Sequence, residues 1–440
     1  MMKQYPLCKD SGIEWIGKIP REWKIVKAKS GLKRVKSIAN QDNPIILSLT
    51  SNGIVKRDIS NNEGQIAASY HDYNQVKKGD LLLNPMDLVS NAFASVSNIE
   101  GVISQAYFNL RSLKGYHNKY YEYYFKLQYW GLTFFAHGRG VSFDNRWTLN
   151  SQTLMNYLIP FPSFFEQKQI ATFLDHKTQL IDKLIEKTKK KIELLKEKRT
   201  ALINHCVTKG LNPNVEIKDS SVKWIGDITK HWEVIKLKYL AEVYSSTVDR
   251  HTYNDERQVS VCHYPDVYNN EFINEDIGLH KGSCSNVEFE RFQLKEGLVI
   301  ITKDSESPDD IGIPCYVETN LNNVVCGYHL SIIGKNKNYI KSKFLFRFIQ
   351  SDIVRCHFEV HSKGITRYSL GKAIIENLFV NLPPLSEQNQ IVKYLDEQTH
   401  KIDTIIEKET QRIELLKEYC QSLISEVVTG KIDVRDEIEV

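Results

Sequence analysis

Few residue patterns in this chain have the types and spacing that a chemical reaction requires. An adenine methyltransferase needs an Asn/Asp-Pro-Pro-aromatic turn, and the nearest string, Asn84-Pro85-Met86-Asp87, lacks the second proline and the aromatic ring. No G-x-x-x-x-G-K-[ST] string is present to cradle a nucleotide phosphate. Pro308-Asp309-Asp310 with Glu318 lacks the Glu-x-Lys that a nuclease carboxylate cluster needs. We therefore predict that the chain has no catalytic residue.

Metal ligation is no better supported. His263 follows Cys262 and His357 follows Cys356, but neither pair has further ligands at a spacing typical of a zinc site. The eight cysteines contain no C-x-x-C pair, which favours reduced thiols over a disulfide framework or a zinc site. We predict no metal site.

Cationic and amide side chains, in contrast, gather in loops that are suited to DNA. Arg and Lys read guanine, Asn and Gln read adenine, and mobile cations hold phosphates. Two loops with a glycine beside a cation occupy corresponding places, at 137–147 and 361–369, and glycine lets the backbone approach a phosphate closely. The leading candidates for DNA contact are Arg139, Arg146, Lys363, Arg367 and Tyr368. Second candidates are Arg57, Lys77, Lys78 and Asn84 in the first half of the chain, and Lys303, Ser305 and Arg250 in the second.

The segments that must position these loops occur twice in the sequence, as an internal repeat. Residues 10–29 and 219–238 agree at nine of 20 positions, including two tryptophans in each copy. Residues 161–208 and 382–429 agree without gaps at 23 of 48 positions. The segments between these copies resemble each other only faintly. The repeated segments stay similar while the segments between them diverge, which indicates that the two intervening segments bind different ligands.

The second repeated segment predicts a long helix in each copy. Its apolar residues alternate at four- and three-residue spacings over about five heptads, which specifies a helix that packs along its length against another helix. Ser163 fits the N-cap of the first helix and Ser386 that of the second. Gly210 and Gly430 are suitable C-terminal stops. The predicted seam consists of Leu174, Ile181, Ile185, Ile192, Leu195 and Leu202 in the first copy and Leu395, Ile402, Ile406, Ile413, Leu416 and Leu423 in the second.

Charge indicates how the two helices pair. Residues 161–212 carry 11 Lys and Arg against 6 Asp and Glu, a net charge of +5, whereas 382–433 carry 6 against 10, a net −4. Opposite charges beside the seam favour pairing between the two helices. Roughly 37 residues at ~1.5 Å each make a rod of about 55 Å. If the pair is antiparallel, the variable domains lie at opposite ends of this rod, which then acts as a ruler.

The variable segments predict globular domains with β-rich cores. Their short alternating apolar runs are separated by Gly, Asn and Asp turns. We therefore expect an α/β (α+β) fold with two globular domains, two long antiparallel coiled-coil helices and a pseudo-two-fold internal repeat. The expected divisions are 1–160 for the first domain, 161–212 for the first helical spacer, 213–381 for the second domain and 382–440 for the second helical spacer.

Composition sets the broad class. The 440 residues are 41% hydrophobic and 25% charged, with a net charge of +4 that permits nucleic-acid binding without requiring it. No apolar run approaches the ~20 residues that cross a bilayer, and the first residues lack the apolar core of a signal peptide. We expect a cytoplasmic protein.

The repeated W-I-G entry, the P-x-x-x-E-Q-x-x-I helix starts and the I-E-L-L-K-E string of the rods resemble the specificity (S) subunit of type I restriction–modification systems. The resemblance covers residues 10–433 and implies two target-recognition domains, 30–160 and 239–381, that each read one half of an asymmetric, two-part site on double-stranded DNA. It also implies helices that fix the spacer and dock two modification subunits. Residues 77–88 with 101–112 resemble one family of recognition domain and 301–317 another, which implies different half-sites.

The resemblance assigns the chemistry to partner subunits. The modification subunits are expected to methylate adenine N6 with S-adenosylmethionine, and a restriction or motor subunit to use ATP and Mg²⁺ for translocation and cleavage. This chain is expected to bind none of these cofactors.

Two other readings stay open. A free-standing DNA-binding or structural coiled-coil adaptor leaves unexplained why two large domains diverge while the rods do not. A cryptic DNA methyltransferase or nuclease requires a catalytic motif that the sequence does not contain.

Overall fold

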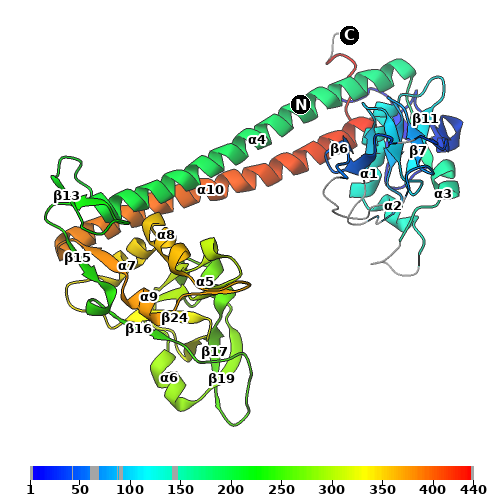
Figure 1. The fold of residues 1–440 in the computed structure, drawn as a ribbon. Coiled ribbons are helices and arrows are strands. Elements are labelled where there is room, and N and C mark those ends of the chain that lie inside the picture. Colours follow the sequence, from blue (N-terminus) through cyan, green and yellow to red (C-terminus); the bar gives the residue numbers. More distant parts are fainter. Residues whose placement is uncertain are drawn as a thin grey trace. The chain divides into compact units, whose positions relative to one another are not determined.

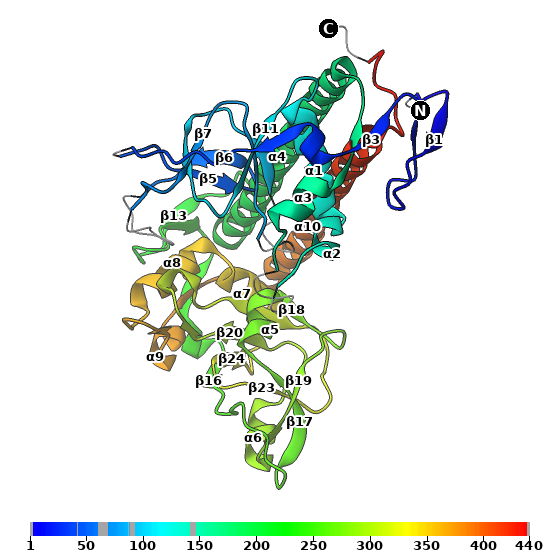
Figure 2. The ribbon, with the colours of Figure 1, turned by 90° about the vertical axis from the view of Figure 1, so that its right-hand side faces the viewer.

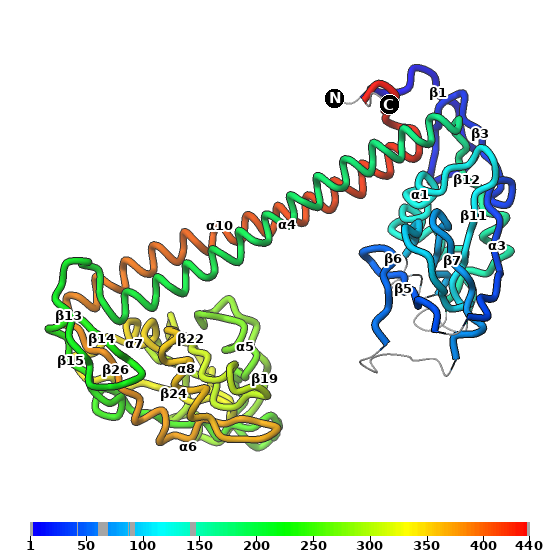
Figure 3. Tube along the Cα trace, turned by 45° about the horizontal axis from the view of Figure 1, so that its top comes forward, coloured from blue at the N-terminus to red at the C-terminus, as the bar shows by residue number. Residues whose placement is uncertain are grey.

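The chain divides into two units, and two long helices belong to both. The computed structural model describes residues 3–41, 43–59, 69–86, 88, 93–140 and 147–437. The first unit is Met1–Thr188 with Gln411–Val440, and the second is Lys189–Thr410. Helices α4 (Phe164–Lys209) and α10 (Leu385–Val428) each cross this division. Within each unit the two helices run alongside one another in opposite directions (Figures 1 and 3).

The apolar seam holds this antiparallel pair together in both units. In the first unit Leu174 of α4 shares a core with Leu423 of α10, and in the second unit Leu395 of α10 shares a core with Ile203 of α4. Each of the twelve seam residues predicted above is buried or half-buried. The helices have 46 and 44 residues, about 69 and 66 Å at ~1.5 Å per residue, and so exceed the expected length.

The two helices begin differently. Ser163 caps α4, because its Oγ accepts the backbone N–H of Glu166 at 3.2 Å. The prediction that Ser386 caps α10 is wrong, since that helix already begins one residue earlier and Ser386 lies exposed inside it. Pro384 replaces the serine cap: its ring holds φ near the helical value, and its carbonyl accepts the N–H of Glu387 at 2.9 Å.

Each long helix ends at a glycine that packs on a tryptophan of the repeated entry segment. Gly210 and Gly430 have φ of +76° and +73°, a left-handed conformation that favours glycine after a helix. A Cβ on Gly210 would lie 3.2 Å from the ring of Trp232, and one on Gly430 would lie 3.2 Å from Trp23. Val434 shares the core of Trp23, so the segment after α10 packs into the core of the first unit.

The first unit is built around a four-stranded antiparallel sheet in the order β4-β11-β8-β9. Helix α1 covers β8 and β9, and its buried tyrosines and Phe125 belong to the core. The described strands of this unit are β1 (Cys8–Asp10), β2 (Lys18–Pro20), β3 (Lys24–Lys27), β4 (Leu32–Arg34), β5 (Leu47–Thr50), β6 (Gly53–Lys56), β7 (Asn74–Val76), β8 (Leu81–Leu83), β9 (Ala94–Val96), β10 (Gly101–Ile103), β11 (Phe108–Ser112) and β12 (Leu158–Phe161). Its short helices are α1 (Asn118–Trp130), α2 (Thr133–Ala136) and α3 (Ser151–Asn156).

The second unit has a five-stranded sheet, β16-β24-β20-β22-β18, and a three-stranded sheet, β19-β17-β23. Figure 2 shows α6 beside β17 and β19, on the three-stranded sheet. The strands are β13 (Ile217–Asp219), β14 (Asp227–Thr229), β15 (Glu233–Lys236), β16 (Glu242–Ser245), β17 (Arg257–Cys262), β18 (Phe272–Ile273), β19 (His280–Cys284), β20 (Val299–Thr302), β21 (Asp304–Ser305), β22 (Pro314–Val317), β23 (Val324–Cys326), β24 (Leu330–Gly334), β25 (Tyr368–Ser369) and β26 (Phe379–Leu382). The short helices are α5 (Tyr264–Asn269), α6 (Asn286–Phe292), α7 (Ser342–Ile349), α8 (Asp352–His361) and α9 (Lys372–Glu376).

The two units share one plan. The order β4-β11-β8-β9 of the first sheet corresponds to β16-β24-β20-β22 of the second, and the pairs β1-β2 and β3-β12 correspond to β13-β14 and β15-β26. Parallel pairing of β17 with β23 and of β18 with β22 makes the second unit mixed. The structure confirms the predicted α/β fold with β-rich domains and long antiparallel helices. Among the described residues, no helix is both long and apolar enough to cross a bilayer.

Candidate nucleic-acid interface

The glutamine of the repeated Glu-Gln pair fastens each long helix to its domain. In the second unit the amide oxygen of Gln388 accepts the backbone N–H of Lys341 at 2.8 Å. Its amide nitrogen donates to the carbonyls of Tyr339 and Pro383 at 2.9 and 2.8 Å. In the first unit Gln167 makes the corresponding bonds to the N–H of His117 and the carbonyls of Gly115 and Pro162, at 2.9, 3.1 and 2.9 Å. One side chain therefore satisfies three backbone groups in each unit.

The aspartate of the repeated Leu-Asp pair makes a second link between helix and domain. Asp175 on α4 accepts the hydroxyl hydrogen of Tyr123 at 2.7 Å. Asp396 on α10 accepts a guanidinium N–H of Arg347 at 2.8 Å. Tyr123 and Arg347 are the sixth residues of α1 and α7, so equivalent positions meet the same aspartate with different chemistry.

Arg347 extends this link into a buried ionic network in the second unit. Its side chain is 2% exposed and also donates to Glu271, which in turn accepts from Arg199 of α4. Arg199 donates through Nε to Asp403 of α10 at 2.9 Å. The network joins α4, α7 and α10, and we infer that it holds this recognition domain at a fixed angle to the helices of its own unit.

The candidate DNA contacts of the second unit gather where β20, the central strand of its main sheet, ends. Lys303 follows the buried strand β20, and Ser305 in β21 pairs with Tyr368 in β25. The backbone of Lys363 exchanges two hydrogen bonds with Ser369, of 3.1 and 2.9 Å. The loop 361–369 is thus a hairpin that folds back on the chain directly after β20.

Gly364 is required by this hairpin. A Cβ at this position would collide with the carbonyl group of Arg367 and the backbone of Tyr368. The sequence interpretation gave this glycine the role of letting phosphate approach, whereas the structure shows that it lets the hairpin close. Arg367 is exposed at the far side of that turn.

Arg367 lies over a pocket of about 290 Å³ that also contains Arg250 and Ser305. Tyr264 and Tyr268 line it as a stacked pair, with ring centroids 5.6 Å apart. His329 and the carboxylates Asp304, Glu306 and Asp310 complete the lining. Arginine recognises guanine and a carboxylate recognises the cytosine amino group, so the pocket contains the donors and acceptors of base readout.

In the first unit the hairpin that carries Arg139 is attached to the sheet by the same pattern of backbone hydrogen bonds. The backbone of Arg139 exchanges hydrogen bonds of 2.9 and 3.0 Å with Thr148. Leu149 then donates its N–H to the carbonyl of Pro85 at 2.8 Å, as Leu370 donates to Lys303 at 2.7 Å in the second unit. Both hairpins therefore attach directly after the corresponding sheet strands, β8 and β20.

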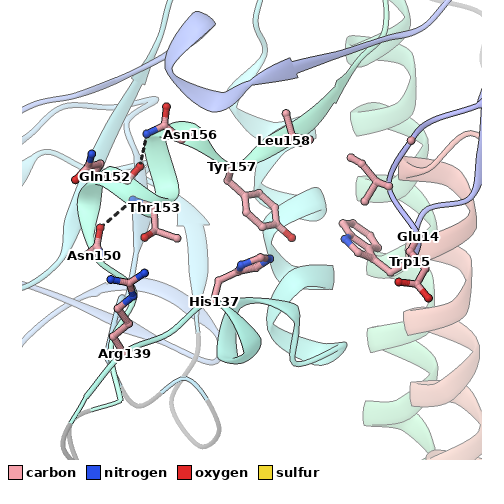
Figure 4. A pocket seen from close by; sticks show the side chains of 12 residues that line it. Glu14, Trp15, His137, Arg139, Asn150, Gln152, Thr153, Asn156, Tyr157 and Leu158 are labelled. Carbon is pink, nitrogen blue, oxygen red and sulfur yellow. Dashed lines mark hydrogen bonds between the residues drawn. The ribbon is translucent and has the colours of Figure 1, made fainter.

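Arg139 lines a larger pocket of about 690 Å³ in this unit. Figure 4 shows Arg139 near Asn150 and Thr153, with the rings of His137 and Tyr157 between them and Trp15. Asn150 caps α3 by accepting the N–H of Thr153 at 2.8 Å. The polar residues Gln152 and Asn156 on α3 line the same pocket.

The other described candidates of the first unit, which are Arg57, Lys77, Lys78 and Asn84, are not among the residues that line this pocket. Lys77 and Lys78 are exposed in the turn before β8, whereas Asn84 follows that strand and is buried. Asn84 therefore lies at the hairpin end of β8, and the two lysines lie at its other end. Arg57 follows β6, where its N–H donates to the carbonyl of residue 46 at 2.8 Å. Arg146 lies outside the described residues.

Several polar residues of these pockets were missed by sequence reasoning. His329 and Asp304 lie 25 positions apart and meet only because Lys303 N–H donates to the His329 carbonyl at 3.1 Å, beside the paired strands β20 and β24. Tyr264 and Tyr268 are one helical turn apart, a spacing that equally fits a packed helix. No local pattern of the sequence reports such strand-to-strand neighbours.

His357, one of the residues weighed as a metal ligand, packs against the scaffold instead. Its ring stacks on Trp224 with centroids 4.4 Å apart. Burial and then the neighbouring His361 lower the pKa of His357 to about 4, so its ring is neutral at physiological pH. Trp224 is therefore covered by α8, whereas Trp15 is 39% exposed beside the pocket of the first unit. In the described part of the chain, no three His, Cys, Asp or Glu side chains are placed to hold a metal ion.

The fold and these two sites define a duplicated recognition protein, in which two unlike domains present cationic hairpins from equivalent places on a shared helical scaffold. The chain belongs to the type I restriction modification DNA specificity domain family, whose model matches residues 24–194 and 229–415.

Related sequences agree with this membership. The chain is 23% identical over 438 residues to the MjaVIII specificity subunit of a type I restriction enzyme from Methanocaldococcus jannaschii, with 95% of each chain covered. It is 26% identical over 298 residues to the MjaX specificity subunit of that organism, covering 66% of this chain and 63% of the relative. Against the EcoBI specificity subunit of Escherichia coli, identity is 24% over 302 residues, which is 64% of this chain and 60% of the relative.

Solved structures share the fold. A chain from a structural study of complex assembly and conformational transition of the type I R-M system matches with a TM-score of 0.70 at 14% identity, covering 94% of this chain and 99% of that one. The HsdS subunit from Thermoanaerobacter tengcongensis matches with a TM-score of 0.54 at 14% identity, covering 94% and 98%.

Proposed function

We propose that this chain is the DNA specificity subunit of a type I restriction–modification complex and that each domain binds one half of an asymmetric, two-part site. The observation that carries the proposal is the pair of cationic hairpins attached at equivalent places but built from different residues. The same backbone attachment places both hairpins in the same position on their sheets. Their different side chains then give the two domains different DNA targets.

The chemistry of such a complex lies on other subunits. We propose that the paired helices fix the spacer between the half-sites and that they, with neighbouring surfaces, dock two modification subunits. Those subunits bind S-adenosylmethionine and methylate adenine, and a motor subunit uses ATP and Mg²⁺, while this chain binds no cofactor and catalyses no step. Its place of action is the cytoplasm, where bacterial and archaeal DNA lies.

Exchange of one recognition segment tests the division of labour. Residues 30–160 are replaced by the corresponding segment of another specificity subunit, and methylated adenines are mapped across the genome of a host that expresses the chimaera with its modification subunits. We expect one half of the methylated motif to change and the other half and the spacer to stay. A change in both halves would contradict the proposal.

A paired insertion tests the ruler. Seven residues with the seam pattern are added to α4 after Lys190 and to α10 after Glu409, because Lys191 pairs with Glu409 across the antiparallel helices and both then stay on the same side of the insert. Two added turns lengthen the pair by about 10 Å, or roughly three base pairs at ~3.4 Å each. The methylated motif should keep both half-sites and gain about three base pairs of spacer. An unchanged spacer would show that the helices do not set it.

A further inference from the structure

The guanidinium of Arg367 is held by a second and a third side chain. Nη2 of Arg367 lies 3.2 Å from Nε2 of His329, and Nδ1 of His329 lies 2.8 Å from Oδ2 of Asp304. A carboxylate accepts hydrogen bonds, and a guanidinium only donates them. The geometry therefore assigns the His329 proton to Nδ1, and Arg367 lies against the ring with its Nη2 at 3.2 Å from Nε2, which keeps its lone pair, and at 3.4 Å from Nδ1.

We propose that Asp304 and His329 are positioning residues that hold Arg367 to read a guanine in the second half-site. The inference rests on the proposed function and deepens it. Arg367 is exposed, whereas the side chains of His329 and Asp304 are 10% and 16% exposed. The chain of bonds thus runs from a nearly buried carboxylate to an exposed guanidinium at the mouth of the pocket.

The free donors of Arg367 fit the guanine edge. Among the described residues, hydrogen bonds to Arg367 involve Nη2, so the N–H groups of Nε and Nη1 have no protein acceptor there. Nη2 carries two N–H groups, so one of them stays free, and beside the N–H of Nε or Nη1 it forms a parallel pair of donors that matches O6 and N7 of guanine in the major groove. A side chain held in place before binding loses less conformational freedom when it binds, and it binds with a defined geometry.

The surroundings favour a base over a phosphate. Stacked Tyr264 and Tyr268 form one wall of the pocket, and Glu306 and Asp310 place carboxylates beside Arg367. Carboxylates repel a phosphate but accept the amino hydrogen of cytosine, the partner of guanine in the base pair.

The described residues of the first domain do not repeat this arrangement. The paired residues Leu83 and Phe108 of the first sheet correspond to Ile301 and Ser331 of the second. Ala106 then stands where the second domain has His329. A substitution of His329 should therefore change one half of the recognised site and leave the other as it is.

The full chain with its modification subunits is expressed in a host without adenine methylation, and methylated adenines are mapped. Purified complexes then methylate duplexes that differ at one guanine of the second half-site. The wild type should show a two-part motif with a guanine at which Arg367→Ala lowers discrimination roughly tenfold or more. His329→Phe, which keeps the ring shape without an acceptor, should relax the same position, and His329→Gln, which keeps an acceptor oxygen, should restore most of the discrimination.

Two further variants keep the test decisive. Asp304→Asn retains an acceptor without the charge and should relax the same position, less than His329→Phe does. If the phenylalanine variant does not fold, Asp304→Asn compared with the wild type carries the test. Arg355→Ala removes an exposed arginine of α8 outside the pocket and should leave the motif unchanged.

Three results would overturn the inference. They are unaltered discrimination in both His329→Phe and Asp304→Asn, a failure of His329→Gln to restore it, and relaxation spread over both half-sites. Absence of any two-part motif for the wild type would instead overturn the proposed function and the inference with it.

Discussion

Replacement of Gln388 by leucine tests whether the repeated Glu-Gln pair fastens helix to domain. Gln388 is fully buried, and leucine of similar size removes its three hydrogen bonds to backbone groups. A hydrogen bond contributes about 1 kcal/mol net, and a buried partner left unsatisfied costs about 1–3 kcal/mol. Because water can reach some of the three groups, we expect the second unit to lose about 3–5 kcal/mol of its free energy of unfolding.

Hydrogen exchange of the full chain measures this loss unit by unit. A loss of about 4 kcal/mol corresponds to exchange faster by roughly three orders of magnitude in the amides that open with the domain. We expect this acceleration at 337–345 and 379–392, with unchanged exchange in the first unit. Gln167→Leu should produce the mirror image, with the acceleration at 113–121 and 160–172.

Gln390 is a matched control because it lies in the same motif, two residues along the helix, and is exposed. Gln390→Leu should change stability by less than about 0.5 kcal/mol. If Gln388→Leu were equally mild, or if it destabilised both units alike, the assignment of the motif to local fastening would be wrong.

Arg347→Met, which removes a buried member of an ionic network, should destabilise the second unit by about 3–5 kcal/mol in urea denaturation, whereas the exposed Arg355→Met should have little effect. Gly364→Ala should lower the free energy of unfolding of the second unit by more than about 1 kcal/mol, because the added Cβ collides with the backbone of the hairpin. Mapping of methylated adenines should then show loss of the second half-site alone. Burial opposes ionisation of Glu122, but Lys126 and Lys119 outweigh it and lower its pKa below the ordinary 4.5. The lowered folded-state pKa means that the stabilisation is complete above about pH 4.5 and is lost as pH falls through the folded value. The stability gap between wild type and Glu122→Gln, about 2 kcal/mol at neutral pH, should therefore shrink in denaturation experiments below pH 4.5.

The helical scaffold was predictable because its information is local and periodic. A seam residue such as Leu395 is identified by its own neighbours at three and four positions, and helix-stopping Gly430 by its residue type. The same locality explains the error at Ser386, since serine is the commoner N-cap and only the path of the preceding strand shows that the helix begins at Leu385, directly after Pro384. The mixed fold of the domains followed from short alternating runs, while their strand order did not.

The sites were predictable in part, for a physical reason. Arg367 and Lys363 were named as candidates because cations in a loop with a glycine are a local signal, and their contact with DNA stays a prediction. Asp304 and His329 carry no such signal, since each is an ordinary polar residue until strand pairing brings the two together. Lys77 and Asn84 illustrate the opposite failure, because residues close in the sequence were grouped although a strand separates them.

The pattern of identity between the two halves follows from which contacts use side chains. The root of each hairpin consists of backbone bonds, Leu149 to Pro85 in one unit and Leu370 to Lys303 in the other. Backbone bonds form with almost any side chain attached, so the readers can diverge without loss of their attachment. The bonds of Gln167 and Gln388 need an amide side chain on the helix and only backbone on the domain.

In such a scaffold the two long helices must carry the same side chains at their contact positions, while the side chains of the domains can differ. Asp175 and Asp396 show the intermediate case, because an aspartate can accept either from a hydroxyl, as from Tyr123, or from a guanidinium, as from Arg347. The helix therefore kept its acceptor in both copies while the domains supplied different donors. Fixed acceptors on the helices and interchangeable donors on the domains allow one helical scaffold to hold two unlike domains. We therefore predict that a foreign domain will attach wherever it offers a donor to this aspartate and three backbone groups to this glutamine.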